Sequence, residues 1–104
     1  MAELKVNGRT TVRKLKEEFK KNFGSTLRVY MNVSCKGRFA DDDATLASIR
    51  AEGARGGELI VGGAKRVGNF EKEFAEAWGI GVRVANADDT ALADSTVTIV
   101  QAGR

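Results

Sequence analysis

The chain has 104 residues, of which 42% are hydrophobic and 30% charged, and this composition is typical of a single folded domain with one modest core. One cysteine and no histidine exclude an intramolecular disulfide, the usual zinc ligand sets and the catalytic arrangements that depend on histidine. The formal net charge is +3, and because no apolar run approaches the roughly 20 residues of a membrane span, we expect a cytoplasmic protein without membrane contact.

The first predicted elements are a short strand in LKV, residues 4–6, and a helix after the turn that contains Gly8. Apolar residues at three- and four-residue steps predict one buried face on this helix: Val12, Leu15, Phe19 and Phe23. Gly24 stands where a helix C-terminus favours a left-handed residue, because glycine has no Cβ to clash there.

A second strand is predicted in TLRVYM, residues 26–31, with Leu27, Val29 and Met31 on one face. The segment NVSCKGRF, residues 32–39, is interpreted as a further strand. A short helix is expected in residues 41–53, capped by Asp42 or Asp43 and ended near Gly53.

Residues 58–85 repeat residues 3–30 without a gap, and ten of the 28 positions are identical. The second helix carries the same apolar pattern and a final glycine at the matching places: Val67, Phe70, Phe74, Trp78 and Gly79. After a loop shorter by two residues, residues 91–102 match residues 38–49 more weakly, and STVTIV, residues 95–100, resembles a strand. The chain is therefore interpreted as a tandem duplication of a unit of about 50 residues.

Two repeats, 3–50 and 58–102, are expected to share one core within a single domain. The predicted fold is an α+β two-layer sandwich in the ferredoxin-like arrangement, with one sheet, both long helices on one face, and parallel strands flanking each helix. As an alternative fold, residues 37–61 resemble the last third of ubiquitin-like β-grasp domains, which have a short strand, an acidic turn, a short helical turn and a final apolar strand.

No residue set supplies a nucleophile with its base, a cofactor site or a metal site, so an enzyme is the least favoured class and no cofactor is expected. The glycine-rich residues 53–69 lack the spacing of a phosphate-binding loop. The acidic triplet at residues 41–43 and the loop from Asn86 fit turns and helix caps better than calcium ligands. Cys35 is interpreted as a small, half-buried side chain.

The favoured function is a small interaction module that binds a protein partner, or a second copy of itself, through an open sheet face or an edge strand. Strand alternation places five residues on the face away from the helices: Lys5, Arg28, Tyr30, Ile60 and Arg83. The alternative for this face is an ordinary solvated surface on which Arg28 and Arg83 pair with Glu3 and Glu58.

The second candidate function is weak binding of nucleic acid or another polyanion, through Arg28, Arg83 and the basic first helix. Residues 1–52 have a net charge of +4 and residues 53–104 a net charge of −1. The excess comes from Arg9, Arg13, Lys14, Lys16, Lys20 and Lys21. Pairs four residues apart, such as Lys14 with Glu18, are also typical of a solvated helix.

Overall fold

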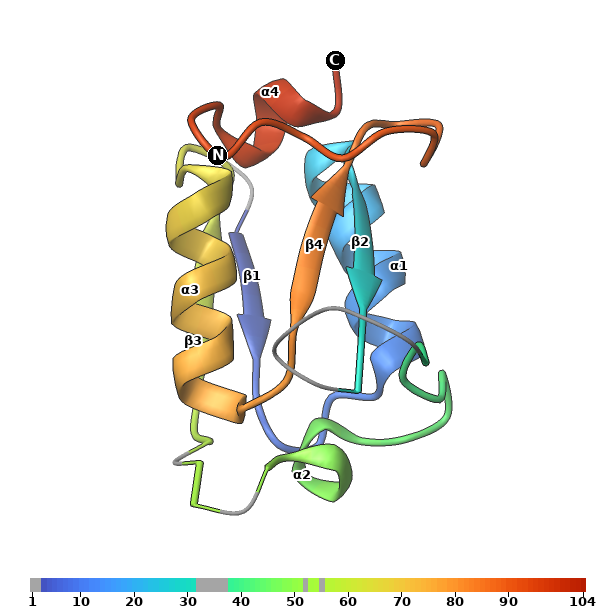
Figure 1. The fold of residues 1–104 in the computed structure, drawn as a ribbon, viewed down its shortest axis with the longest axis vertical. Helices are drawn as coiled ribbons and strands as arrows, with labels where there is room; N and C mark the ends of the chain where they lie inside the picture. The colour runs from blue at the N-terminus through green and yellow to red at the C-terminus, as the bar shows by residue number, and fades with distance from the viewer. Residues whose placement is uncertain (1–2, 32–37, 52, 55) are drawn as a thin grey trace.

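The structure of the chain is a computed structural model that describes residues 3–31, 38–51, 53–54 and 56–104. Its elements in chain order are β1 (Glu3–Val6), α1 (Val12–Phe23), β2 (Thr26–Val29), α2 (Leu46–Ile49), β3 (Leu59–Gly62), α3 (Val67–Trp78), β4 (Val82–Ala85) and α4 (Ile99–Ala102). The result is a small α+β protein whose four strands run along the long axis, with α3 in front of β3 and α1 behind β2 (Figure 1). None of these helices has the length and hydrophobicity that a bilayer span needs.

The four strands form two antiparallel pairs, β1 with β3 and β2 with β4. In the first pair Lys5 lies opposite Ile60, and in the second Arg28 lies opposite Arg83. The partners are 55 positions apart in both cases, so each strand pairs with the strand at the matching place in the other half of the chain.

The expectation of one sheet with both long helices on one face is therefore wrong for the described residues, although β1 and β2, which flank α1, run in the same direction (Figure 1). The β-grasp alternative also requires a single sheet. Each strand pairs instead with its counterpart in the other half of the chain, and local loops take part of the outer edges of β2 and β4. Ala40 N–H donates to the Val29 carbonyl, and Ala93 N–H donates to the Val84 carbonyl, both at 2.9 Å.

The two long helices form where their apolar spacing predicts them, and their buried faces are confirmed. Eight side chains on these faces have 5% or less of their surface exposed: Val12, Leu15, Phe19, Phe23, Val67, Phe70, Phe74 and Trp78. Thr11 caps the start of α1 by accepting a hydrogen bond from Lys14 N–H. Gly24 and Gly79 end the helices with φ of 80° and 68°, so both left-handed C-caps are confirmed.

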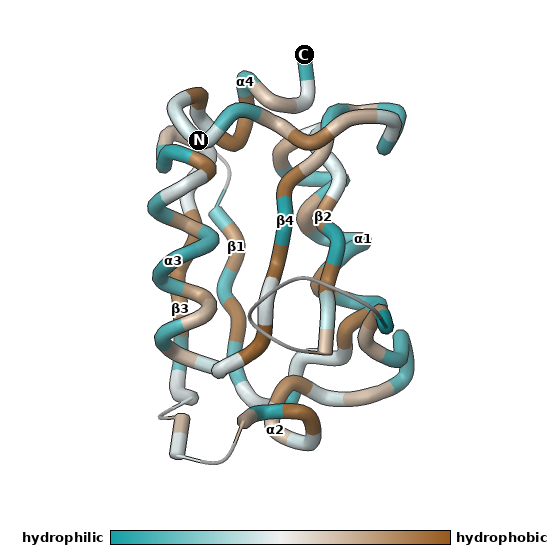
Figure 2. Tube along the Cα trace, viewed as in Figure 1, coloured by the Kyte–Doolittle hydropathy of each residue, from teal (hydrophilic) through white to brown (hydrophobic). Residues whose placement is uncertain are grey.

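The two faces meet in one hydrophobic cluster that contains residues of both halves. The rings of Phe19 and Phe70 lie 5.5 Å apart between the centroids and join α1 to α3. The strands contribute Leu4, Val6, Val61, Leu27, Val29, Val82 and Val84. Figure 2 shows hydrophobic and hydrophilic residues alternating along β4, because one side of the strand faces this cluster and the other faces solvent.

The two short helices differ from the sequence predictions. α2 spans only Leu46–Ile49 and is capped by Thr45 rather than by Asp42 or Asp43. Residues 95–100, expected as a strand, instead contain a turn and the start of α4, which Thr98 and Gln101 cap reciprocally. The β-branched residues therefore serve here as a helix cap and as core contacts, since Ile99 is fully buried.

The end of β2 also differs from its predicted alternation. Met31 is 42% exposed, whereas Tyr30 is buried with 8% exposed, because the strand ends at Val29 and Tyr30 bridges to Phe39. Most of the strand expected in residues 32–39 lies outside the described residues, and so does Cys35.

Backbone contacts recur between the two halves at constant offsets. The bridge Thr11 to Thr45 has its counterpart in Arg66 to Thr98, and the bridge Tyr30 to Phe39 has its counterpart in Ala85 to Leu92. The first member of each bridge moves by 55 positions and the second by 53, as the shorter second loop requires.

Candidate functional site

The five residues predicted for a partner surface do not share one face. Lys5 and Ile60 are exposed on the outer side of the β1–β3 pair, and Ile60 has 47% of its surface exposed. Arg28 and Arg83 lie on the outer side of the separate β2–β4 pair. Tyr30 is buried. The expected single face is therefore replaced by two, because the strands form two pairs and not one sheet.

Both arginines are paired with acids, although not with those that the sequence suggested. Arg28 Nε lies 2.6 Å from Asp89 Oδ1, and its Nη2 donates to the Asp89 carbonyl at 3.1 Å. Hydrogen bonds to Asp89 and Tyr30 hold the pKa of Arg28 above its ordinary value, although burial opposes them. Arg83 Nη1 lies 3.6 Å from Glu71 Oε1. Among the described residues, neither arginine forms an ion pair with Glu3 or Glu58.

The basic surface of α1 is partly neutralised by nearby carboxylates. Arg13 pairs with Asp43 at 2.9 Å, Lys14 with Glu18 at 3.1 Å, and Lys16 with Asp42 at 2.6 Å. Within the described ranges, three of the six cations predicted for polyanion binding therefore have an acidic partner. Lys20 donates to the Ala87 carbonyl, while Arg9 and Lys21 lie on the exposed surface.

A hollow of about 470 Å³ runs along β2 and brings part of both predicted sets together. Its lining includes every residue of the strand, together with Lys16, Lys20, Phe39, Ala87, Asp88 and Asp89. Phe39 has 57% of its surface exposed, and its ring lies 4.9 Å from that of Tyr30 between the centroids. Phe39 is not among the five residues predicted for a partner surface. The sequence marks Phe39 only as an aromatic residue that belongs to neither of the two apolar helix faces.

The hollow follows the outer edge of β2. Tyr30 N–H donates to the Gly81 carbonyl at 2.8 Å, which fixes Arg28 and Arg83 as a hydrogen-bonded pair in the alternating antiparallel pattern. The N–H and C=O groups of Leu27 and Val29 therefore point away from β4, toward the hollow. Within the residues that the structure describes, the one backbone partner on this edge of Leu27 and Val29 is Ala40, whose N–H donates to the Val29 carbonyl.

A smaller hollow of about 280 Å³ lies at the matching place in the second half, along β4. Five of its lining residues stand 55 positions after residues that line the hollow along β2: Glu71, Ala75, Gly81, Val82 and Arg83. Glu71 takes the place of Lys16, and its Oε2 accepts a hydrogen bond from Val84 N–H at 3.0 Å. The edge of β4 is thus covered from within the chain.

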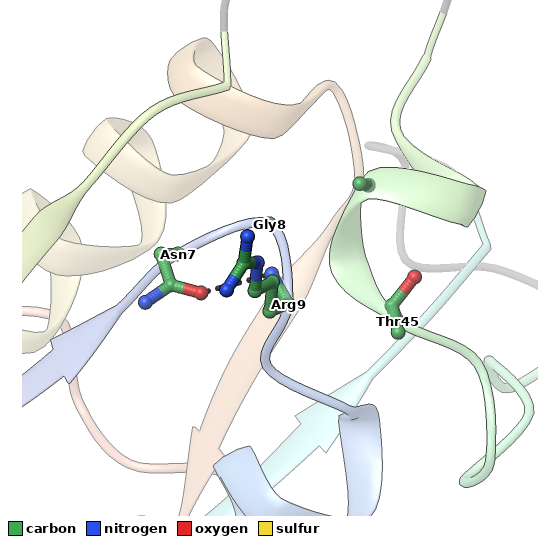
Figure 3. Close-up of a pocket in the computed structure, with 5 residues that line it drawn as sticks. Asn7, Gly8, Arg9 and Thr45 are labelled. Atoms are coloured by element: carbon green, nitrogen blue, oxygen red, sulfur yellow. Dashed lines mark hydrogen bonds between the residues drawn. The ribbon is translucent and has the colours of Figure 1, made fainter.

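A third hollow, of about 600 Å³, lies between the turn after β1 and the start of α2 (Figure 3). Asn7, Gly8, Arg9, Thr45 and Ala47 line it. Asn7 Oδ1 accepts a hydrogen bond from Arg9 N–H at 2.8 Å, and Figure 3 shows Asn7 and Arg9 side by side with Thr45 across the hollow. With one titratable lining residue, this hollow offers no convergent set of chemical groups.

Side-chain oxygens in the loop from Asn86 to Thr96 accept hydrogen bonds from backbone N–H groups of their own turns. Asn86 Oδ1 accepts from Thr90 N–H at 2.8 Å, and Asp94 Oδ1 accepts from Thr96 N–H at 2.8 Å. These bonds to Thr96 hold the pKa of Asp94 below its ordinary value. Across the residues described, no group of three or more potential metal ligands lies together.

Comparison of the chain with protein-family models, with curated proteins and with solved structures finds no match.

Proposed function

We propose that this protein is a small interaction module that binds a protein partner through the outer edge of β2. The observation that carries this proposal is the hollow of about 470 Å³ along that edge, lined by all four residues of β2 and by the exposed ring of Phe39. An extended peptide that adds to a sheet edge gains backbone hydrogen bonds, and neighbouring side-chain contacts give specificity. The backbone groups of Leu27 and Val29 offer the hydrogen bonds, and the exposed ring of Phe39 offers a side-chain contact.

The edge of β2 is a better candidate than the other exposed surfaces. The matching edge of β4 is covered by Glu71. The outer face of β1–β3 presents Ile60 beside Lys5, and neither residue lines the hollows along β2 and β4 or the hollow beside α2. Polyanion binding through α1 ranks second, because Arg13, Lys14 and Lys16 already have acidic partners.

The test selects binding peptides from a phage-displayed library of random dodecapeptides and maps the selected peptide by amide NMR. We expect the amide signals of Leu27, Arg28 and Val29 to shift. Phe39→Lys is expected to abolish binding, because the apolar ring borders the hollow. Leu92→Lys is the matched control, since Leu92 stands at the corresponding place in the second half and is exposed to a similar extent, 52% against 57%.

Two results would contradict the proposal: no enriched peptide, or an enriched peptide that shifts signals elsewhere. Retention on heparin that falls steeply with salt and is lost in Lys20→Glu would instead support the polyanion function.

We also infer that the two halves are copies of one unit, as the matching sequences and the contacts at offsets of 55 and 53 suggest. In that case Ala102 and Glu3 correspond to Ile49 and Glu58, which the chain already joins by a short connection. A circular permutant that starts at Glu58 and joins Arg104 to Glu3 through a short linker is therefore expected to fold. Loss of cooperative urea unfolding in this permutant would count against the inference.

A further inference from the structure

Glu71 supplies a hydrogen-bond acceptor to a backbone N–H on the outer edge of β4. Val84 N–H points away from β2 and donates to Glu71 Oε2 at 3.0 Å. Burial raises the pKa of the Glu71 carboxyl, while the hydrogen bond from Val84 and the charge of Arg83 lower it. The protein thus places a carboxylate from α3 against a strand N–H that would otherwise lack an acceptor.

The corresponding position on β2 has the same backbone hydrogen bonding, but the neighbouring helix side chain carries the opposite charge. Val29 stands 55 positions before Val84. The Val29 carbonyl accepts a hydrogen bond from Ala40 N–H, just as the Val84 carbonyl accepts one from Ala93 N–H. Lys16 stands 55 positions before Glu71. An ammonium group only donates hydrogen bonds, so Lys16 cannot serve Val29 N–H as Glu71 serves Val84.

Val29 N–H has no acceptor in the part of the chain that the structure describes. Val29 lines the hollow along β2, so an acceptor can reach it from outside the chain.

We propose that this hollow binds an aspartate or glutamate side chain of an extended partner peptide, with the carboxylate against Val29 N–H and Lys16. The carboxylate then takes the place that Glu71 takes on β4. The proposal rests on the proposed function, and it adds the chemistry of the partner.

The charges around the hollow fit this ligand. Lys16 already contacts Asp42 at 2.6 Å, and an ammonium with three donors can serve a second carboxylate. Lys20 donates to the neutral carbonyl of Ala87. Of the two acids in the lining, Asp89 is held by Arg28. The exposed ring of Phe39 provides an apolar contact for a neighbouring peptide side chain.

Lys16→Glu is the decisive variant, because it copies the arrangement of the second half into the first. The new carboxylate is expected to accept from Val29 N–H, which moves the Val29 amide proton signal downfield and slows its exchange with solvent. Lys21→Glu makes the same charge change on the exposed surface of α1 and is expected to leave the Val29 amide unchanged.

The peptides selected from the random dodecapeptide library provide the second measurement. We expect them to share one acidic position, and replacement of that acid by its amide is expected to weaken binding roughly tenfold or more, as for a charge-assisted hydrogen bond. Lys16→Glu is expected to abolish binding and Lys21→Glu to preserve it.

The outcomes separate the two proposals. If selected peptides shift the β2 amides but bind equally well with the amide in place of the acid, the carboxylate site is wrong and the edge interaction stands. An unchanged Val29 amide in Lys16→Glu also overturns the carboxylate site. If no selected peptide shifts the β2 amides, the edge interaction itself is wrong.

Discussion

Arg28 and Arg83 face each other directly across the β2–β4 pair, and each is neutralised by an acid from a different segment. Asp89 comes from the loop after β4, and Glu71 comes from α3. Like charges directly opposite on two strands destabilise the pair. The pairing of β2 with β4 therefore depends in part on these two acids.

Asp89→Asn is expected to lower the free energy of unfolding by roughly 0.5–1 kcal/mol, as measured by urea denaturation. Asparagine tolerates the left-handed backbone of Asp89, where φ is 57°, so the change removes the charge and keeps the turn. The loss should shrink as salt screens the two arginines. Asp88→Asn, at an exposed neighbouring position, is the control, and an equal loss in both variants would contradict this explanation.

Glu71→Gln is expected to change how stability depends on pH. Burial holds the folded-state pKa of Glu71 above its ordinary value, so the folded protein takes up this proton at a higher pH than the unfolded chain. The contribution of Glu71 to the free energy of unfolding therefore increases as the pH falls through the range just above the ordinary glutamate pKa. Urea denaturation between pH 7 and pH 4 is expected to show a loss of this component in Glu71→Gln. Parallel pH profiles would disprove it.

Phe19→Ala is expected to cost about 3–5 kcal/mol, because it opens a cavity where Phe19 meets Phe70 in the shared core. Phe39→Ala removes the same atoms from a largely exposed site, where stacking on Tyr30 is the principal contact, and is expected to cost less than about 1 kcal/mol. Thermal and urea unfolding of both variants provide the comparison. Similar losses in the two variants would contradict the expected difference in burial between Phe19 and Phe39.

Gly79→Ala is expected to destabilise the protein more than Gly24→Ala, although both glycines end a helix in the same backbone conformation. Each change costs about 1–2 kcal/mol for placing a Cβ in the left-handed region. At Gly79 the new Cβ would also lie 2.4 Å from Ala51 Cβ, whereas at Gly24 the nearest heavy atom is 3.8 Å away. Overpacking adds roughly 1–3 kcal/mol. The double variant Gly79→Ala with Ala51→Gly should recover this added cost, and failure to do so would refute the clash.

The long helices were predictable from the sequence because their information is local. Apolar steps of three and four residues define the buried face of α1 from Val12 to Phe23, and Gly24 marks its end. The strand pairing was not predictable in this way. It depends on contacts between segments far apart in the chain, since β1 pairs with β3 and β2 with β4, and no local periodicity describes these contacts.

The candidate site was only partly predictable. Strand alternation correctly turned Arg28 and Arg83 outward, but it could not show that Asp89 and Glu71 would hold them. Lys16 is distinguished from the other cations of α1 only by its comparison with Glu71 in the folded structure, because the sequence presents it as one cation among several on a solvated helix. Tyr30 was misplaced, since the strand ends one residue before it and Phe39 covers its ring.

The pairing of strands across the two halves has a consequence for synthesis of the protein. β1 meets its partner only when residues 59–62 have been made, and β2 only when residues 82–85 have been made. Pairings between distant segments form slowly, because a long loop of chain must first be closed. The first half therefore emerges from the ribosome before the partner strands of β1 and β2 exist, and the two strand pairs form only after residues 59–62 and 82–85 have been made.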